Sequence, residues 1–199
     1  MILKSLISCY TLLLFSGFSC NPESILQGLK NYVKDTFYAA GCQDVPCNST
    51  AGIPEALSIA KEAEYVIVVA GLDLSQETED LDRYSLLLPG HQMALIRAVA
   101  SVSKKPVVLV LTGGGPVDVS FAEGDQQIAS IIWIGYPGET GGKALSQILF
   151  GEYNPGEYDS ESTFRACTIV DDVLVHQYAA NYMSFLGMNK DVTARNLMK

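Results

Sequence analysis

Five carboxylates crowd into one short polar segment of the chain, residues 71–83. A pair of carboxyl groups can cleave a glycosidic bond when one is kept protonated as the acid and the other stays ionised. Crowded like charges raise a carboxyl pKa, whereas a neighbouring cation such as Arg83 holds a carboxylate ionised. Composition alone favours the alternative of an acidic loop that only faces water. A calcium loop is a third interpretation, although the spacing does not match the helix-loop-helix calcium site. The acidic residues are Asp73, Glu77, Glu79, Asp80 and Asp82.

Two glycine-rich segments come close to phosphate-binding loops but depart from them at required positions. Gly113-Gly-Gly-Pro-Val-Asp118 lacks the third glycine of the dinucleotide fingerprint. The 136–143 segment has Pro137 where the first glycine of a phosphate loop belongs, and Ala144 where a metal-binding hydroxyl belongs. We therefore interpret it as a tight turn before a helix packed against the sheet. The chain has no Gly-x-Ser-x-Gly elbow and no cysteine and histidine set with zinc spacing, so we predict no metal and no cofactor.

Alternating strand and helix patterns surround these segments and must position them. Apolar runs rich in β-branched residues predict buried strands at 65–70, 107–111 and 128–134. Helical spacing and early prolines predict helices near Ile53 and after Pro89, with another over 143–150. This alternation predicts an α/β fold, a mostly parallel sheet flanked by helices. The loops after the strands should then meet at one edge of the sheet, where ligands bind in such folds.

Composition and charge restrict the class of protein. The chain has 199 residues, of which 48% are hydrophobic and 18% charged, so it can bury a core and is too apolar to be disordered. A net charge of -9 argues against nucleic acid as a partner, because phosphate binding needs clustered lysine and arginine. Trp133 lies inside an apolar run, and core packing is a commoner role for such a residue than a platform for a sugar.

Residues 1–19 resemble a secretory signal, with Lys4, a largely apolar run and then small residues. The run is too short and too often interrupted by hydroxyl side chains for stable membrane insertion. Cys42 and Cys47 are close enough in sequence for a local disulfide, which is favoured in a secreted chain, whereas in the cytosol they would be free thiols. Asn48-Ser49-Thr50 is an acceptor sequon for N-glycosylation. Together these features predict a secreted, extracellular chain.

Four groups of residues, which include the segments described above, follow one another in a characteristic order along residues 20–156. They read Gly71-Leu-Asp…Glu77-x-Glu79-x-x-Asp82-Arg83…Leu-Pro89-Gly90-x-Gln92, then Gly-Gly-Pro116-Val-Asp118-Val-Ser-Phe121, then Trp133-Ile-Gly-Tyr136-Pro-Gly-Glu-x-Gly-Gly142, then Ile148-Leu-Phe-Gly151-x-x-Asn-Pro-Gly156. In this order they resemble the C-terminal α/β sandwich domain of plant β-xylosidases and α-arabinofuranosidases in glycoside hydrolase family 3. The resemblance implies a retaining glycosidase of the cell wall that acts on xylo- or arabino-oligosaccharides.

The resemblance also implies roles for single residues. By its position in the motif, the acid/base carboxylate is Glu77, with Glu79 as the fallback, and Asp82 and Arg83 form a structural pair near the site. The nucleophile of the family is an aspartate of a preceding (β/α)8 barrel, and no residue of this chain matches it. We therefore predict that the chain is inactive or nearly so on its own, and that a barrel domain supplied elsewhere is its partner.

The sequence departs from the family at both ends. The first strand of the sandwich, expected just before Cys20, is missing, so the 20–156 domain is predicted to be incomplete. Residues 157–199 form a divergent tail, predicted to be irregular or partly helical, with a helix over 173–186. Two other hypotheses stay open, a non-catalytic carbohydrate-binding fragment and a truncated product without function.

Overall fold

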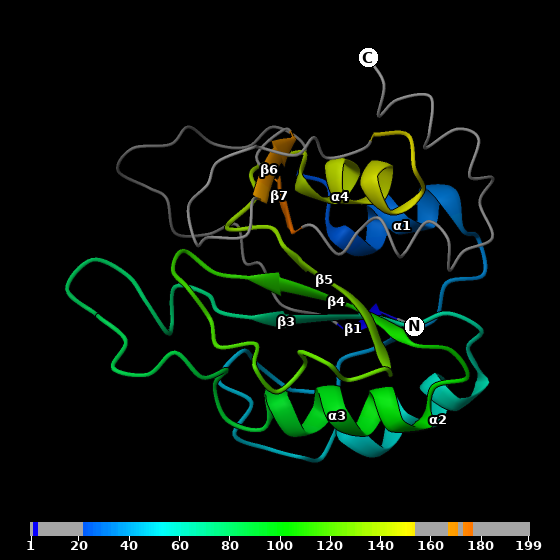
Figure 1. The fold of residues 1–199 in the computed structure, drawn as a ribbon, viewed down its shortest axis with the longest axis horizontal. Coiled ribbons are helices and arrows are strands. Elements are labelled where there is room, and N and C mark those ends of the chain that lie inside the picture. The colour runs from blue at the N-terminus through cyan, green and yellow to red at the C-terminus, as the bar shows by residue number, and fades with distance from the viewer. Residues whose placement is uncertain (1, 4–21, 154–166, 171–172, 177–199) are drawn as a thin grey trace.

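A computed structural model describes residues 2–3, 22–153, 167–170 and 173–176. Its centre is a five-stranded parallel sheet flanked by helices on both faces, which confirms the predicted α/β class (Figure 1). The strands follow the order β2-β1-β3-β4-β5. Their bounds are β1 Ile2–Leu3, β2 Tyr38–Ala39, β3 Ile67–Gly71, β4 Val107–Thr112 and β5 Ile128–Trp133.

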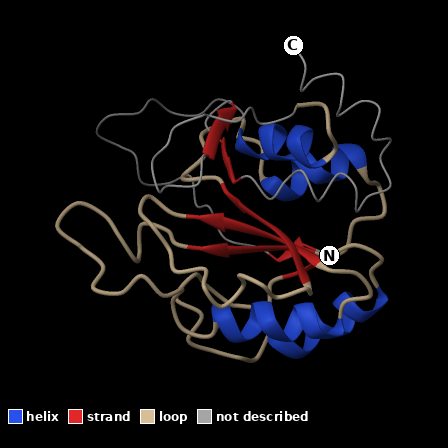
Figure 2. Cartoon of the chain, in the orientation of Figure 1, coloured by secondary structure: helices blue, strands red, loops and turns tan. Residues whose placement is uncertain are grey.

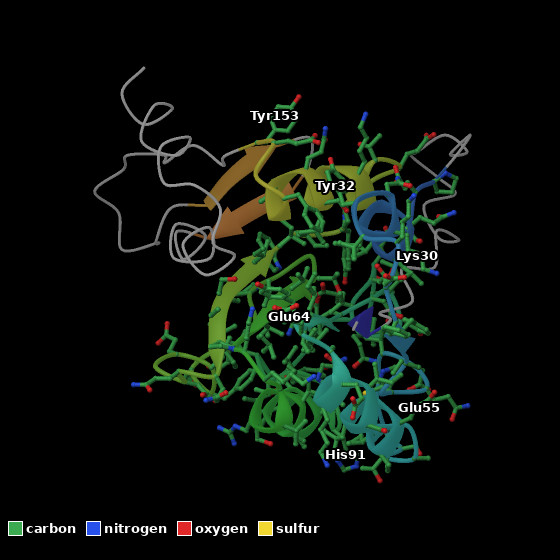
Figure 3. All side chains as sticks on the ribbon, turned by 90° about the vertical axis from the view of Figure 1, so that its right-hand side faces the viewer. Lys30, Tyr32, Glu55, Glu64, His91 and Tyr153 are labelled. Atoms are coloured by element: carbon green, nitrogen blue, oxygen red, sulfur yellow. A yellow bond between two sulfur atoms is a disulfide. The ribbon has the colours of Figure 1, made fainter. Side chains whose placement is uncertain are left out.

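Two pairs of helices cover the sheet. The helices α1 (Ile25–Tyr32) and α4 (Gly141–Leu149) lie on one face, and α2 (Ile53–Glu62) and α3 (Gln92–Val102) lie on the other (Figure 1). A view turned by 90° shows the same layers, with Tyr32 of α1 on one side and His91, just before α3, on the opposite side (Figure 3). The sheet is therefore the middle layer of three.

Burial on both faces explains the continuous apolar runs of the central strands. All six residues of β4 are buried. Alternate side chains of a strand point to opposite faces, and accordingly Val68 and Leu109 pack in the core under α2 and α3. Val69 and Val108 pack in the core under α1 and α4. A strand that needs apolar side chains on both faces carries no polar alternation in its sequence.

Helix α1 was not predicted, although the sequence contains its start signal. Ser24 and Gln27 form a capping box, in which the Ser24 hydroxyl accepts from the Gln27 N–H and the Gln27 side chain accepts from the Ser24 N–H. Helix α1 lies so close to α4 that a Cβ atom at Gly28 would collide with the Gly142 carbonyl. The ring of Tyr32 stacks on that of Phe150 with 4.5 Å between centroids.

Both ends of the chain differ from the expectation in what the structure describes. The strand predicted to be missing just before Cys20 falls outside the described residues, and in the described part β1, at residues 2–3, lies in the sheet between β2 and β3. Most of the 1–19 signal-like segment lies outside the described residues, and its role stays a prediction. In the tail, β6 (Cys167–Val170) pairs antiparallel with β7 (Val173–His176). The predicted helix over 173–186 is therefore wrong for residues 173–176, where a Val-Leu-Val run favours extended backbone.

The carboxyl ends of β3 and β4 point to the side of the molecule from which the long loops extend (Figure 2). The loop after β3 is the longest of the described connections there and runs from residue 72 to residue 91. None of the helices in the described ranges has the length and apolar character that crossing a membrane requires.

Candidate active site

The acidic loop begins at a tightly fixed point, the end of β3. The buried side chain of Gln92 accepts from the Gly71 N–H at 2.8 Å and donates to the Gly71 carbonyl at 2.8 Å and to the Val45 carbonyl at 2.6 Å. Gly71 has a φ of 128°, and a Cβ atom there would collide with the Thr112 carbonyl. Only glycine tolerates this combination of conformation and close approach.

Two turns shape the loop after this fixed point. The Asp73 carboxylate accepts from the backbone N–H of Ser75 at 2.9 Å, and the Glu77 N–H donates to the Asp73 carbonyl. Thr78 and Leu81 then pair as a tight antiparallel bridge, with hydrogen bonds in both directions. Glu79 and Asp80 form the tip of this hairpin, where Asp80 adopts a φ of 66°. The hairpin thus presents two acidic side chains at its end.

The Glu77 carboxylate joins the three loops at this edge of the sheet. Its Oε1 accepts from the Gly114 N–H at 2.6 Å, in the loop after β4, and from the Tyr136 hydroxyl at 2.6 Å, in the loop after β5. Its Oε2 accepts from Nε of Arg83 at 2.9 Å. Arg83 also donates from its Nη2 to the Pro116 carbonyl at 2.8 Å. We call Glu77, Arg83, Gly114 and Tyr136 the clamp. The predicted convergence of the three loops is confirmed by these contacts.

The pKa of Glu77 shifts in the direction opposite to the one expected for a catalytic acid. Crowding of carboxylates was expected to raise a pKa in this loop. Burial does raise the pKa of Glu77, but the hydrogen bonds from Tyr136, Gly114 and Arg83, together with the Arg83 charge, outweigh it and leave that pKa below its ordinary value. On Tyr136, burial and then the bond to Glu77 raise the phenol pKa well above 10.0. Glu77 is therefore a carboxylate that its surroundings keep ionised.

Arg83 does not pair with Asp82. The sequence interpretation of Asp82 and Arg83 as a structural pair is wrong, because the guanidinium turns to Glu77 and to backbone carbonyls instead. Asp82 is exposed, and among the described residues its side chain has no hydrogen-bond or ion-pair partner.

Glu79, the second acid/base candidate, has surroundings unlike those of Glu77. It is exposed at the hairpin tip, and within the described part of the chain its carboxylate makes no hydrogen bond and no ion pair. An acid must hold a proton and pass it to a substrate oxygen, so it needs an oxygen that is accessible and not occupied by donors. Both oxygens of Glu77 are occupied by donors, whereas those of Glu79 are accessible.

The cysteine pair lies beside the residues that hold the start of the acidic loop. Cys42 and Cys47 form the disulfide that the sequence analysis favoured for a secreted chain, with 5.0 Å between their Cα atoms. The enclosed turn includes buried Val45, whose carbonyl receives the Gln92 amide. The His91 backbone N–H donates to the Cys47 carbonyl at 3.0 Å. Asn48 follows the disulfide and is exposed, so its sequon is accessible.

The glycine-rich segments serve the packing and the clamp. The Gly114 N–H, which a phosphate would need, donates to Glu77. A Cβ atom at Gly141 would collide with Pro137, and one at Gly142 would collide with the Ser24 carbonyl. The second segment is thus a turn before a helix, as predicted, but it packs against the start of α1. Among residues 22–153 and the short described strands, no group of His, Cys, Asp or Glu is placed to hold a metal ion.

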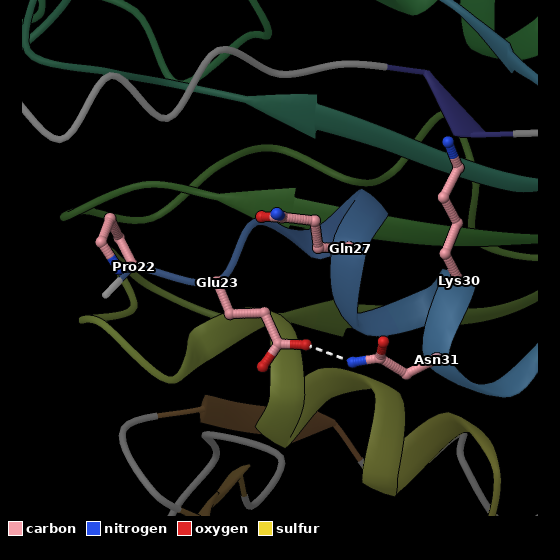
Figure 4. Close-up of a pocket in the computed structure, with 5 residues that line it drawn as sticks. All are labelled: Pro22, Glu23, Gln27, Lys30 and Asn31. Atoms are coloured by element: carbon pink, nitrogen blue, oxygen red, sulfur yellow. Dashed lines mark hydrogen bonds between the residues drawn. The ribbon is translucent and has the colours of Figure 1, made fainter.

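Two other features lie apart from the clamp. A surface pocket beside α1 is lined by Pro22, Glu23, Gln27, Lys30 and Asn31 (Figure 4), none of them a predicted site residue. Trp133 packs at the border of the core under α2 and α3, in accordance with the packing role preferred from its sequence.

Comparison with known proteins gives a consistent result. The family model for the glycosyl hydrolase family 3 C-terminal domain matches residues 10–157. "Probable beta-D-xylosidase 6" of Arabidopsis thaliana is 63% identical over 142 residues, which are 71% of this chain and 18% of that protein. "Beta-xylosidase/alpha-L-arabinofuranosidase 1" of Medicago sativa subsp. varia is 50% identical over 141 residues, again 71% and 18%. The solved structure of a GH3 exo-beta-xylosidase (XlnD) with a xylobiose aziridine probe superposes with a TM-score of 0.67 at 36% identity and covers 71% and 18% of the two chains. The chain therefore spans about one fifth of the length of the relatives that it matches.

Proposed function

The chain belongs to the glycosyl hydrolase family 3 C-terminal domain family, and we propose that it supplies the acid/base carboxylate of a retaining β-xylosidase. The substrates in this proposal are xylo- or arabino-oligosaccharides, the class that the names of its relatives indicate. One observation carries the proposal to the site. A carboxylate-bearing hairpin lies beyond the carboxyl ends of a parallel sheet, where such folds bind ligands.

Glu79 has the better geometry for the acid/base role. Glu77, the first candidate from the sequence, accepts hydrogen bonds at both oxygens and is held ionised. Protonating it would remove the negative charge that faces the Arg83 guanidinium. Glu79 lies exposed two residues further along, at the hairpin tip. The assignment of Glu77 stays a prediction, and the structure supports Glu79 as the alternative to test first.

The proposed mechanism is a double displacement. The protonated Glu79 carboxyl gives its proton to the leaving glycosidic oxygen while a second carboxylate attacks the anomeric carbon. The ionised Glu79 then takes a proton from the water that releases the sugar. Retaining enzymes place the two carboxyl groups about 5 Å apart. We propose that the second carboxylate comes from a (β/α)8 barrel domain, within the four fifths of the relatives' length that this chain does not match. On this basis the chain alone is inactive or nearly so.

We also propose that the chain is secreted to the cell wall. The disulfide between Cys42 and Cys47 and the exposed sequon at Asn48 support an oxidising route. Mass spectrometry of the chain recovered from the medium of a secreting eukaryotic host tests this. A glycan on Asn48 and an intact disulfide are expected, and retention inside the cell without a glycan would refute it.

The acid/base proposal is tested in a chimera and in the chain alone. Residues 20–156 replace the matched stretch of the Arabidopsis relative, whose 63% identity favours a compatible exchange. The chimera should hydrolyse xylo-oligosaccharides and nitrophenyl β-xyloside, and the chain alone should not. Glu79→Gln in the chimera should slow xylo-oligosaccharides far more than nitrophenyl β-xyloside, because nitrophenolate departs with little help from an acid.

Azide separates an acid/base residue from a residue that only maintains the fold. Azide needs no general base, so it attacks the glycosyl-enzyme carbon, forms a carbon–nitrogen bond and releases the enzyme carboxylate as the carbon–oxygen bond breaks. It should restore turnover of nitrophenyl β-xyloside in Glu79→Gln and form xylosyl azide. An active, folded Glu79→Gln chimera with unchanged rates would refute the assignment. Saccharide binding by the chain alone that survives Glu79→Ala would instead favour a carbohydrate-binding fragment.

A further inference from the structure

The clamp closes the acidic loop on both sides of its hairpin. Glu77 precedes the hairpin and bonds to Gly114 and Tyr136. Arg83 follows the hairpin and bonds to Glu77, the Pro116 carbonyl and the Ser85 carbonyl. We propose that Glu77, paired with Arg83, is a positioning residue that fixes the hairpin and thereby the location of the Glu79 carboxylate. This inference rests on the proposed function in one respect, that Glu79 is the acid/base group.

The geometry makes the clamp the main restraint on the hairpin. Glu79 is two residues from Glu77 and four residues from Arg83. An extended residue spans about 3.5 Å, so two anchors this close limit the tip to movements of a few ångströms. Without the clamp, the nearest restraints from outside the loop are the buried Leu72, whose backbone bonds to Thr112, and the Leu86 carbonyl, which accepts from the Asp118 N–H. A loop of that length samples many positions, and a misplacement of about 1 Å can cost about 100-fold in rate.

The contacts of Glu77 depend on its charge as well as on its size. The side chains of Glu77 and Arg83 are 18% and 14% exposed, so water only partly screens their attraction. A glutamine at position 77 keeps the size and one acceptor oxygen. Its NH2 group, however, would face the Arg83 guanidinium, or the Gly114 N–H and the Tyr136 hydroxyl, if the amide turned over. The substitution Glu77→Gln therefore opens the clamp without a large change of volume.

The rate at which trypsin cleaves after Arg83 reports whether the clamp is closed or open. The enzyme must take the Arg83 side chain into its pocket, and that side chain is bonded to Glu77 and Pro116 in the closed clamp. The next residue, Tyr84, is fully exposed, so burial of that side chain does not protect the peptide bond between residues 83 and 84, whereas the bonds of the Arg83 side chain do. In the full chain, Glu77→Gln should speed this cut about tenfold, the loss expected for a charge-assisted hydrogen bond. Glu79→Gln makes the same change of charge two residues away and should alter the rate by less than about twofold.

An internal reference distinguishes local opening from unfolding. Lys61 lies in the last turn of α2, where cleavage requires the helix to unfold. Faster cutting confined to Arg83 supports the clamp. Equal rates in wild type and Glu77→Gln would overturn it, and so would a parallel rise at Lys61.

The nuclear magnetic resonance signal of the Tyr136 ring tests the hydrogen bond between Tyr136 and Glu77. With ring-labelled tyrosine, the Tyr136 signal is assigned from its loss in Tyr136→Phe. Burial, and after it the 2.6 Å bond to Glu77, raise the pKa of the Tyr136 phenol, so that signal should titrate at lower pH in Glu77→Gln and at unchanged pH in Glu79→Gln. An unchanged titration in Glu77→Gln would overturn the clamp. If the clamp readouts appear but Glu79→Gln leaves the chimera fully active, the clamp stands and the proposed acid/base role of Glu79 falls.

Discussion

Replacing Gln92 with leucine tests how strongly the root of the acidic loop is held. The Gln92 side chain is 4% exposed and makes three hydrogen bonds, two with Gly71 and one with the Val45 carbonyl. Leucine has a similar volume and no polar atom. The substitution therefore removes the bonds and leaves the Gly71 N–H, the Gly71 carbonyl and the Val45 carbonyl facing an apolar side chain.

The magnitude follows from the groups left unpaired. A buried donor or acceptor that loses its partner costs about 1 to 3 kcal/mol. The three groups together should cost about 3 kcal/mol, because some relaxation toward water is possible at a loop and leucine gains some apolar burial. With a urea dependence of about 2 kcal/mol per molar for a domain of this size, the unfolding midpoint should fall by about 1.5 M.

Urea unfolding followed by far-ultraviolet circular dichroism measures this change. The matched control is Gln126→Leu, since Gln126 is exposed and makes no side-chain hydrogen bond within the described part of the chain. Its free energy of unfolding should differ from that of wild type by less than about 0.5 kcal/mol. Gln92→Glu adds a second test, because a carboxylate there would face the Gly71 and Val45 carbonyls. Burial would raise that carboxyl pKa, so the stability of Gln92→Glu should fall as pH rises from 4 to 7.

The reasoning is refuted if Gln92→Leu and Gln126→Leu unfold at the same urea concentration. It is also refuted if Gln92→Glu is as stable at pH 7 as at pH 4 relative to wild type, since the carbonyl partners would then not determine which side chain fits.

Three further outcomes are expected. Reducing the bond between Cys42 and Cys47 should lower stability by about 2 kcal/mol, the loop-closure contribution of a short disulfide loop, seen as a lower urea midpoint with reductant. No shift would mean that the turn is held by its other contacts. Gly71→Ala should lower the thermal midpoint more than Gly124→Ala, because both positions have positive φ but only Gly71 has no room for a Cβ atom. Equal shifts would contradict the crowding. The folded-state pKa of Glu77 lies below 4.5, so the stability advantage of wild type over Glu77→Gln should be complete at neutral pH and vanish as pH falls through that lower value. An advantage that persists below pH 2 in urea titrations would show that the Glu77 charge is not its source.

The central strands and their helices were predictable because local pattern and burial agree. Strand β4 is a run of apolar, mostly β-branched residues, and all six are buried. Such a run is typical of a strand that is buried on both faces, so its pattern predicts the strand. The Ser24 and Gln27 capping box marks the start of α1 and was overlooked. At Val173 the sequence was interpreted as helix, and the structure has a strand there because the pairing segment at Cys167 decides between two conformations that the local pattern allows.

The sequence by itself predicted the α/β fold, the edge of the sheet where the loops meet, the disulfide favoured for a secreted chain and the acidic segment of the candidate site. It could not determine which carboxylate is anchored and which is free. That choice depends on donors 37 and 59 residues away from Glu77, Gly114 and Tyr136. Only the tertiary structure brings those donors to one oxygen, and a carboxylate with both oxygens occupied is less accessible to a ligand than an identical, exposed side chain two residues along the same loop.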